Sequence, residues 1–240
     1  MMSALLVVCE CFALVLITSA PSFTVHLMLD RKSVKATMDI EKIESGVIAD
    51  AALRVEYDHR GRPHPHASTH FGFLSEADRG QAIRDITRAK QIGAAEINFH
   101  IPSEIQFVSM RNEAVGLAFM DFVSDLGRQL EIRVVWENAP LLTPPTWSLV
   151  EQTAFIPKGY DLCLDTGHLI LGASCREEAV DRIDAFIYEH GAFVRHLHIH
   201  INDLVSDQHN NDPVDVITFL GFERFKSLVE GRSYIFEKGL

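Results

Sequence analysis

Short apolar runs alternate with segments of helical periodicity along most of this 240-residue chain. The runs have the length and composition of buried strands. They lie at 23–29, 53–57, 94–100, 132–137, 160–165, 194–201 and 233–237. Between them are three helical stripes, which begin near Ile83, Val115 and Val180, and two of these segments end at Gly93 and Gly191, where a helix is expected to stop. The alternation predicts βαβ units with a parallel sheet, and so an α/β fold.

The first twenty residues are nearly all apolar and have two interpretations. Leu5 and Ile17 belong to runs that suit a buried first strand of the sheet. A targeting segment is the alternative, since small residues precede Pro21, although Glu10 lies within the run and no Lys or Arg comes before it. A strand within residues 1–20 brings the number of predicted strands to eight. We therefore expect a (β/α)8 barrel of near-minimal length, as a single domain over residues 1–240.

Five consecutive predicted strands end in a carboxylate or an imidazole. These residues are His100, Glu137, Asp165, His200 and Glu237, separated by steps of 37, 28, 35 and 37 residues. In such a barrel the carboxyl ends of the strands carry the chemistry, so these side chains are expected at one rim. A charged group that ends a buried strand is costly unless it is paired or coordinated. Five of them in register predict a bound metal.

The ligand types narrow the choice of metal. Glu137, Asp165, His200 and Glu237 offer three oxygens and one nitrogen, which suits Mn²⁺, Mg²⁺, Co²⁺ or Zn²⁺. Further imidazoles and a carboxylate lie close by in the sequence. They are His64, His66, His70, His168, Asp207 and His209.

The same part of the chain contains five short motifs: VVWENAP at 134–140, LCLDTGH at 162–168, HIHIND at 198–203, DQH at 207–209 and IFEKG at 235–239. These motifs resemble the xylose isomerase-like barrel superfamily, which contains sugar and sugar-phosphate isomerases and epimerases and the endonuclease IV type of apurinic/apyrimidinic endonuclease (AP endonuclease family 2). The resemblance covers about residues 60–240. It implies a TIM barrel with one divalent metal held by Glu137, Asp165, His200 and Glu237.

The endonucleases of this superfamily hold two more zinc ions, making three. By resemblance, the ligands of one would be His66 and His100 beside a bridging Glu137. The ligands of the other would be His168, Asp207 and His209. His64 and His70 are alternatives to His66, because the motif in that segment is loose.

The isomerase hypothesis assigns catalysis to Glu137, Glu237 and His168. One glutamate removes a proton next to the substrate carbonyl, the other returns it, and the metal stabilises the enediolate. His168 holds a substrate hydroxyl or acts as a second acid. The residues expected to bind the carbohydrate substrate are Asn138, His198 and Arg62. A homo-oligomer is also expected by resemblance.

The endonuclease hypothesis replaces the carbohydrate with DNA cleaved 5′ to an abasic site by a trinuclear zinc centre. Arg60 and Arg62 are candidates to hold phosphates. However, Gln208 stands where these endonucleases have an arginine, and Ile101 follows His100 where they have a His-Pro-Gly-Ser type of segment. The sequence therefore favours the isomerase or epimerase, with the endonuclease as the alternative.

The composition also favours the isomerase or epimerase hypothesis over the endonuclease hypothesis. The chain has 22 basic and 33 acidic residues, a net charge of −11, which provides no global attraction to nucleic acid. The four cysteines show neither a disulfide framework nor zinc-ribbon spacing, so we expect a cytoplasmic protein. Residues 1–20 are short for a membrane span and contain Glu10, so no membrane association is expected.

Overall fold

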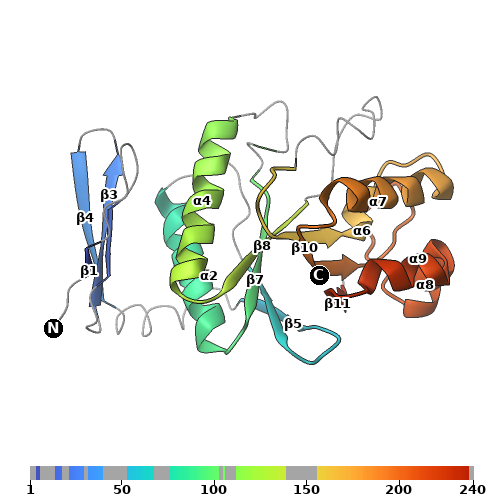
Figure 1. Cartoon of the computed structure of the whole chain (residues 1–240), viewed down its shortest axis with the longest axis horizontal. Helices are drawn as coiled ribbons and strands as arrows, with labels where there is room; N and C mark the ends of the chain where they lie inside the picture. The colour runs from blue at the N-terminus through green and yellow to red at the C-terminus, as the bar shows by residue number, and fades with distance from the viewer. Residues whose placement is uncertain are drawn as a thin grey trace. The chain divides into compact units, whose positions relative to one another are not determined.

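The computed structural model describes residues 53–67, 76–102, 105, 112–138 and 156–237, and in the first 52 residues it describes four strands. The chain forms two compact units, Met1–Ala52 and Leu53–Leu240. Figure 1 shows the helices and strands of both units. The expectation of a single domain over 1–240 stays a prediction.

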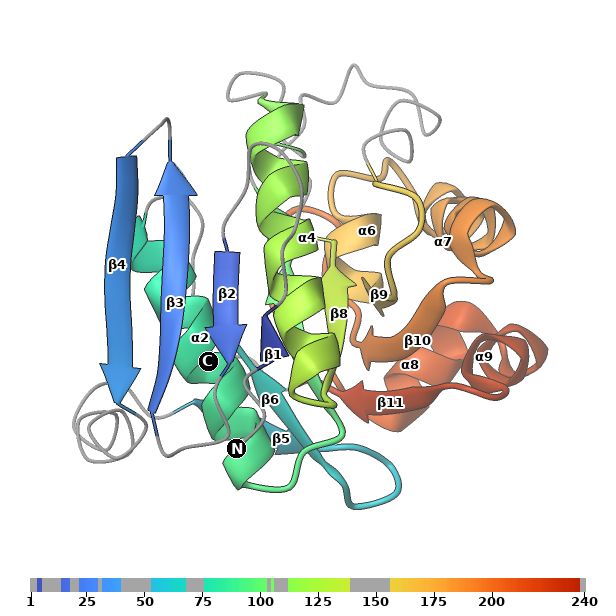
Figure 2. The same ribbon diagram turned by 60° about the vertical axis from the view of Figure 1, so that its left-hand side comes forward.

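The first unit is an antiparallel sheet with strand order β1-β2-β3-β4. Its strands are β1 (Ala4–Leu5), β2 (Leu14–Ile17), β3 (Ser22–Leu29) and β4 (Lys32–Asp39), shown side by side in Figure 2. The interpretation of 1–20 and 23–29 as barrel strands is therefore wrong for the described residues. Two residues connect β3 to β4, which allows a hairpin, whereas parallel strands need a crossover of a dozen residues or more.

The second unit contains a seven-stranded sheet with order β11-β10-β9-β8-β7-β6-β5. The strands from β6 to β11 pair in parallel, and β5 pairs antiparallel with β6. They are β5 (Arg54–Tyr57), β6 (Pro63–His66), β7 (Glu96–His100), β8 (Arg133–Glu137), β9 (Leu162–Asp165), β10 (Val194–Ile199) and β11 (Ser233–Phe236). The α/β class and the predicted strands from 94–100 onward are confirmed.

The predicted strand at 53–57 exists, but its direction was not foreseen. It is the first arm of a β-hairpin, whose turn is held by Asp58. One oxygen of Asp58 accepts the backbone N–H groups of Arg60 and Arg62, each at 2.9 Å. The second arm is β6, although it contains Pro63 and Pro65, which are unusual inside a strand.

The hairpin brings the two ends of the sheet together. The backbone N–H of His59 donates to the carbonyl of Tyr234 on β11 at 2.9 Å, and the N–H of Tyr234 donates to His59 Nδ1 at 3.2 Å. Arg54 also reaches Glu237, just beyond β11. The sheet is therefore nearly barrel-shaped, with six parallel strands and one antiparallel strand among the described residues. The complete eight-stranded barrel stays a prediction.

Helices alternate with the strands, as the apolar stripes predict (Figure 1). Ile86 and Phe119 are buried on two of these stripes, and Phe119 packs near Trp136 of β8. Gly93, with a φ of +73°, follows the first long helix. The helices are α2 (Glu76–Gln91), α4 (Glu113–Gln129), α6 (Thr166–Ile170), α7 (Arg176–His190), α8 (Pro213–Leu220) and α9 (Phe222–Val229).

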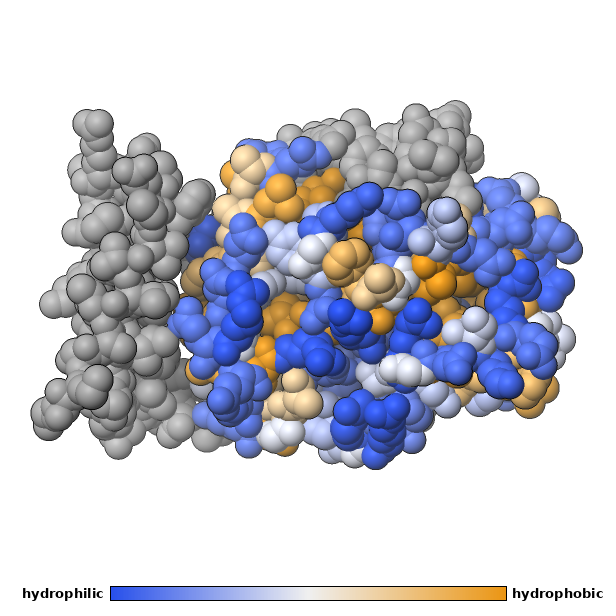
Figure 3. All heavy atoms as spheres, in the orientation of Figure 1, coloured by the Kyte–Doolittle hydropathy of each residue, from blue (hydrophilic) through white to orange (hydrophobic). Residues whose placement is uncertain are grey.

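On the face shown in Figure 3, the described residues are mostly polar, with apolar side chains interspersed. The large exposed apolar residues come from separate elements: Tyr57, Val115, Tyr188, Val205, Val214 and Phe222. Within the part of the chain that the structure describes, every helix is too short or too polar to cross a membrane.

Candidate metal centre

The carboxyl ends of β6 to β11 place histidines and carboxylates at one rim of the sheet. The register supports this directly, since His100 on β7 pairs with Glu137 on β8. Each of the nine predicted ligands belongs to at least one group of side chains whose donor atoms lie within 4.8 Å of one another. These residues are His66, His100, Glu137, Asp165, His168, His200, Asp207, His209 and Glu237. Their convergence is thus shown, while their role as ligands stays a prediction.

Glu137 lies at the centre of this rim and is buried. Its Oε1 faces three imidazoles: His198 Nδ1 at 3.3 Å, His168 Nδ1 at 3.4 Å and His100 Nε2 at 3.6 Å. Its Oε2 accepts a hydrogen bond from Asn98 on β7, a residue that the sequence pattern did not single out. One carboxylate is therefore shared by side chains from three other elements.

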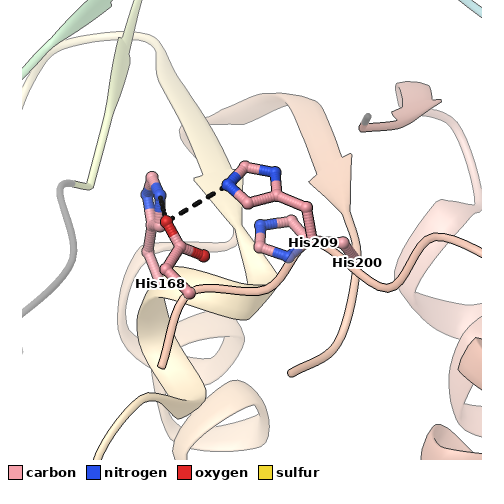
Figure 4. Close-up of side chains that lie close together, drawn as sticks. His168, His200 and His209 are labelled. Carbon is pink, nitrogen blue, oxygen red and sulfur yellow. Dashed lines mark hydrogen bonds and ion pairs between the residues drawn. The ribbon is translucent and has the colours of Figure 1, made fainter. Parts of the chain in front are cut away.

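His168, Asp207 and His209 form a second group beside the first (Figure 4). His168 Nδ1 lies 2.9 Å from the carbonyl oxygen of Asn138, so its Nε2 faces Asp207 Oδ2, at 3.3 Å. The same oxygen lies 3.1 Å from His209 Nε2. A histidine whose other ring nitrogen donates to a carbonyl is oriented as in metal sites.

His200 joins this group to Asp165 and Glu237. Its Nε2 lies 3.0 Å from Asp165 Oδ1 and 3.9 Å from Glu237 Oε2, and its ring stacks on that of His209 with centroids 4.1 Å apart. Asp165 also caps helix α6 by accepting the backbone N–H of His168 at 2.7 Å. The Asp-Thr-Gly-His motif thus ends a strand, begins a helix and supplies two side chains to the rim.

Strand β5 contributes two charged residues that sequence reasoning missed. Arg54 Nη1 lies 3.4 Å from Glu237 Oε1, and Glu56 Oε2 lies 3.1 Å from His66 Nε2. The alternation in Arg-Val-Glu-Tyr places both side chains on one face. Nothing in the sequence indicated that this face meets His66 and Glu237, because that contact depends on the hairpin.

The three residues expected to bind substrate have different surroundings. His198 is fully buried among the rim residues. Asn138 uses both amide atoms on the backbone of Asp165, donating to its carbonyl at 3.0 Å and accepting its N–H at 2.9 Å. Arg62 pairs with Asp58 in the hairpin turn, at the amino end of β6. Arg62 thus lies at the opposite end of β6 from the rim, where the antiparallel β5 brings Arg54 instead, and its role in substrate binding stays a prediction.

The structure places two of the three alternative ligands, His64, His66 and His70, while the choice among them stays a prediction. His66 ends β6 and belongs to a group with Glu137 and His198. His64 lies one layer deeper, beside His196 and His198. His70 lies outside the described residues.

The separations at the rim fit metal ions held between the side chains. Two nitrogens bound at about 2.0–2.1 Å to a tetrahedral zinc are about 3.3–3.4 Å apart. His168 Nε2 lies 3.3 Å from Asp207 Oδ2, and His209 Nε2 lies 3.1 Å from the same oxygen. Among the described residues, Glu237 Oε2 and His209 Nδ1 are buried with no hydrogen-bond partner. Such orphaned atoms in a carboxylate and imidazole cluster are what divalent metals would satisfy.

The electrostatics of the rim are dominated by burial and by charge pairing. Burial raises the pKa of Asp165. Burial also opposes ionisation of Glu137, but the imidazoles of His198 and His100 hold its pKa well below the usual range. Burial lowers the pKa of His168, yet the carboxylates of Asp165 and Asp207 raise it to about 10. The rim therefore balances negative charge with positive charge.

Two solved structures of proteins from Thermus thermophilus are similar to this chain. The first, the TTHB071 protein soaked with ZnCl2, is 18% identical with a TM-score of 0.48, covering 81% of this chain and 75% of that chain. The second, endonuclease IV, is 14% identical with a TM-score of 0.45, covering 82% of this chain and 73% of that chain. No protein-family model and no curated protein match the sequence.

Proposed function

We propose that this chain is a metal-dependent phosphodiester hydrolase of the endonuclease IV type, with a multinuclear zinc centre that acts on DNA at abasic sites. The observation that carries the proposal is the convergence of nine donor residues at one rim. A protein-bound zinc ion usually takes four ligands. Nine donors therefore fit two or three ions, more than an isomerase with a single metal requires.

Divalent ions held at this rim would supply Lewis acidity to polarise the phosphodiester and activate water. The chain's own residues arrange the ligands. Glu137 presents Oε1 to three imidazoles, while Asn98 holds its Oε2. Asn138 fixes Asp165 through its backbone and receives the Nδ1 side of His168, which turns Nε2 toward Asp207. Because Glu137, Asp165 and Glu237 are buried, water does not reach the sides of their carboxylates that would face away from the ions.

The net charge of −11 does not oppose a local attraction to phosphate. Three zinc ions would bring six positive charges to four carboxylates, so the loaded centre would be positive. Arg54, with a side chain 29% exposed, adds a cation beside Glu237. The attraction to DNA would then come from the loaded centre rather than from the protein as a whole.

The proposal is tested by loading the protein with zinc and measuring cleavage of a duplex that contains one abasic site. We expect cleavage on the 5′ side of that site and its loss on chelation. His209→Ala should lose most of the activity, whereas Tyr188→Ala, which removes an exposed side chain of helix α7, should keep it. Absence of cleavage by the zinc-loaded protein, or equal cleavage by the His209 variant, would contradict the proposal.

A sugar or sugar-phosphate isomerase is a second candidate, supported by one contact. Glu137 Oε1 and Glu237 Oε2 lie 3.3 and 3.4 Å from the same atom, His198 Nδ1. Two glutamates near one point are what proton removal and return require. A panel of ketoses and their phosphates tests this candidate: Glu137→Gln and Glu237→Gln should each abolish turnover, while His209→Ala should retain it.

A further inference from the structure

Thr166 is the residue of the Asp-Thr-Gly-His motif whose side chain has no part in the proposed centre. It is the first residue of helix α6, directly after β9, and it is only 1% exposed. Buried hydroxyl groups are almost always hydrogen-bonded, so the partners of this one indicate what the side chain does. Those partners belong to the backbone of a rim residue, His200.

The hydroxyl of Thr166 contacts both backbone polar groups of His200. Its Oγ1 donates to the His200 carbonyl at 2.7 Å and accepts the His200 N–H at 3.2 Å. The carbonyl of His198 lies farther away, at 3.4 Å. A hydroxyl has one hydrogen to donate and two lone pairs that accept, so it can make the two shorter contacts together. A single side chain therefore holds the peptide groups on both sides of the His200 Cα.

These contacts continue the pairing of β9 with β10 past the point where the backbone ladder ends. The last registered pair of the two strands is Asp165 with His198, and β10 ends at Ile199. From Thr166 onward the chain forms helix α6, whose backbone has no strand geometry. The hydroxyl of Thr166 thus takes the place of a peptide group for His200, where an unpaired buried N–H or carbonyl would be costly.

The imidazole that this backbone carries belongs to the candidate metal centre. His200 Nε2 lies 3.0 Å from Asp165 Oδ1, and the ring stacks on His209 (Figure 4). Side chains at metal sites keep their distance to the ion within about 0.2 Å of the usual value. A small shift of the His200 backbone would therefore take its imidazole out of range of an ion at the rim.

We propose that Thr166 is a positioning residue for metal binding, whose hydroxyl holds the backbone of His200 so that the imidazole meets the ion. This role rests on the proposed function, because it requires that His200 binds a metal. Thr166 would act only through His200. Residues that orient metal ligands typically change the metal affinity about 10- to 100-fold.

The test measures the zinc affinity of Thr166→Val and Thr166→Ser by competition with a chromophoric chelator. Valine has the shape of threonine without the hydroxyl, whereas serine keeps the hydroxyl. We expect Thr166→Val to bind zinc about 10- to 100-fold more weakly and Thr166→Ser to bind it nearly as the wild type does. Ser233→Ala is the matched control, since it removes a buried hydroxyl that contacts Glu96 and His196 at the start of β11. An unchanged affinity in Thr166→Val, or an equal loss in Ser233→Ala, would overturn the proposal.

A double-mutant cycle tests whether Thr166 acts through His200. His200→Ala removes the ligand, so adding Thr166→Val to it should cause no further loss of zinc affinity. A general loss of structure would instead weaken zinc binding by the same factor in both backgrounds. Independent, additive effects of the two substitutions would therefore overturn the positioning role.

A measurement on the wild type keeps the proposal testable if Thr166→Val does not fold. Because Thr166 rather than the ion holds the backbone, the His200 amide should exchange its hydrogen as slowly in the metal-free protein as in the zinc-loaded one. Fast exchange that becomes slow only when zinc binds would overturn the proposal.

Failure of the proposed function is separately visible. A wild type that binds zinc but does not cleave the abasic-site duplex would contradict the endonuclease activity, and the zinc affinities would still decide the role of Thr166. A wild type that cleaves the duplex, with equal zinc affinity in Thr166→Val, would overturn the role of Thr166 alone. A wild type that binds no zinc would overturn both.

Discussion

Gly167 lies directly against the imidazole of His200. A Cβ atom built on Gly167 would overlap the ring of His200, so only glycine fits between helix α6 and the end of β10. Gly167 is the third residue of the Asp-Thr-Gly-His motif. The same motif that supplies Asp165 and His168 therefore also leaves room for a ligand from the next strand.

Gly167→Ala should displace His200 and destabilise the protein. Forcing a methyl group into a filled space typically costs about 1–3 kcal/mol in the free energy of unfolding. Urea denaturation measures this cost, and zinc titration should show weaker binding at the rim. Gly80→Ala is the matched control, because Gly80 is inside helix α2 and the nearest atom to its added Cβ is 3.6 Å away. That variant should be as stable as the wild type or more so. Equal stabilities for wild type and Gly167→Ala would contradict the packing described here.

Asn138→Leu tests whether Asn138 positions a ligand or binds the substrate. Its two hydrogen bonds to the backbone of Asp165 predict a loss of about 1–3 kcal/mol in stability. They also predict zinc binding weakened about 10- to 100-fold, as for other residues that orient ligands. A raised KM with unchanged zinc affinity would instead support the substrate-binding role expected from the sequence.

Asp58 predicts a pH dependence that is independent of the metal centre. Burial raises its pKa, but hydrogen bonds from the backbone and side chain of Arg62 and from the backbone of Arg60 lower it below 3.8 overall. A lowered pKa stabilises the folded state at pH values above 3.8, and this contribution is lost as the pH falls through the folded-state pKa.

The stability difference between wild type and Asp58→Asn should therefore be largest near neutral pH. It should shrink as the pH falls below 3.8. Urea denaturation of both proteins between neutral and acidic pH measures this difference. Both proteins contain the same rim residues, so the effect of their titration on stability cancels when the two are subtracted. A difference that stays constant over this range would show that the hairpin turn does not depend on the charge of Asp58.

Removal of metal should lower the thermal stability. Each ion that binds only the folded state contributes about 2.7 kcal/mol when its free concentration is 100 times the dissociation constant. Chelation also leaves Glu137, Asp165 and Glu237 close together without a neutralising ion. We expect Tm to fall on addition of a chelator, and to fall less in His209→Ala, which begins with fewer ions. A wild-type Tm that a chelator leaves unchanged would contradict a bound metal.

The sequence predicted the rim well because one regularity controls it. Parallel strands in register bring their last residues together, so His100, Glu137 and Asp165 could be placed from spacing alone. His168, Asp207 and His209 follow from the motif resemblance, since loops have no such spacing rule. The structure brings all of these side chains together.

The sequence failed where strand direction depends on a connection. An apolar run at 23–29 or 53–57 does not show whether its neighbour is parallel, and both runs belong to antiparallel hairpins. This error moved Arg62 to the wrong end of the sheet and concealed Arg54 and Glu56 at the rim. The contact of His64 with His196 was missed for another reason: alternation put His196 and His198 on one face, but nothing in the sequence placed His64 beside them.

On the proposed function, the rim holds more than one metal ion. The most direct test is the zinc content per chain of the purified, zinc-loaded wild type and of an Asp207→Ala, His209→Ala double variant. The double variant removes two donors of one group and leaves Glu137, Asp165, His200 and Glu237 in place. We predict that it contains one zinc ion fewer than the wild type and still retains zinc. Equal zinc content in the two proteins, or a wild type that binds no metal, would contradict the claim.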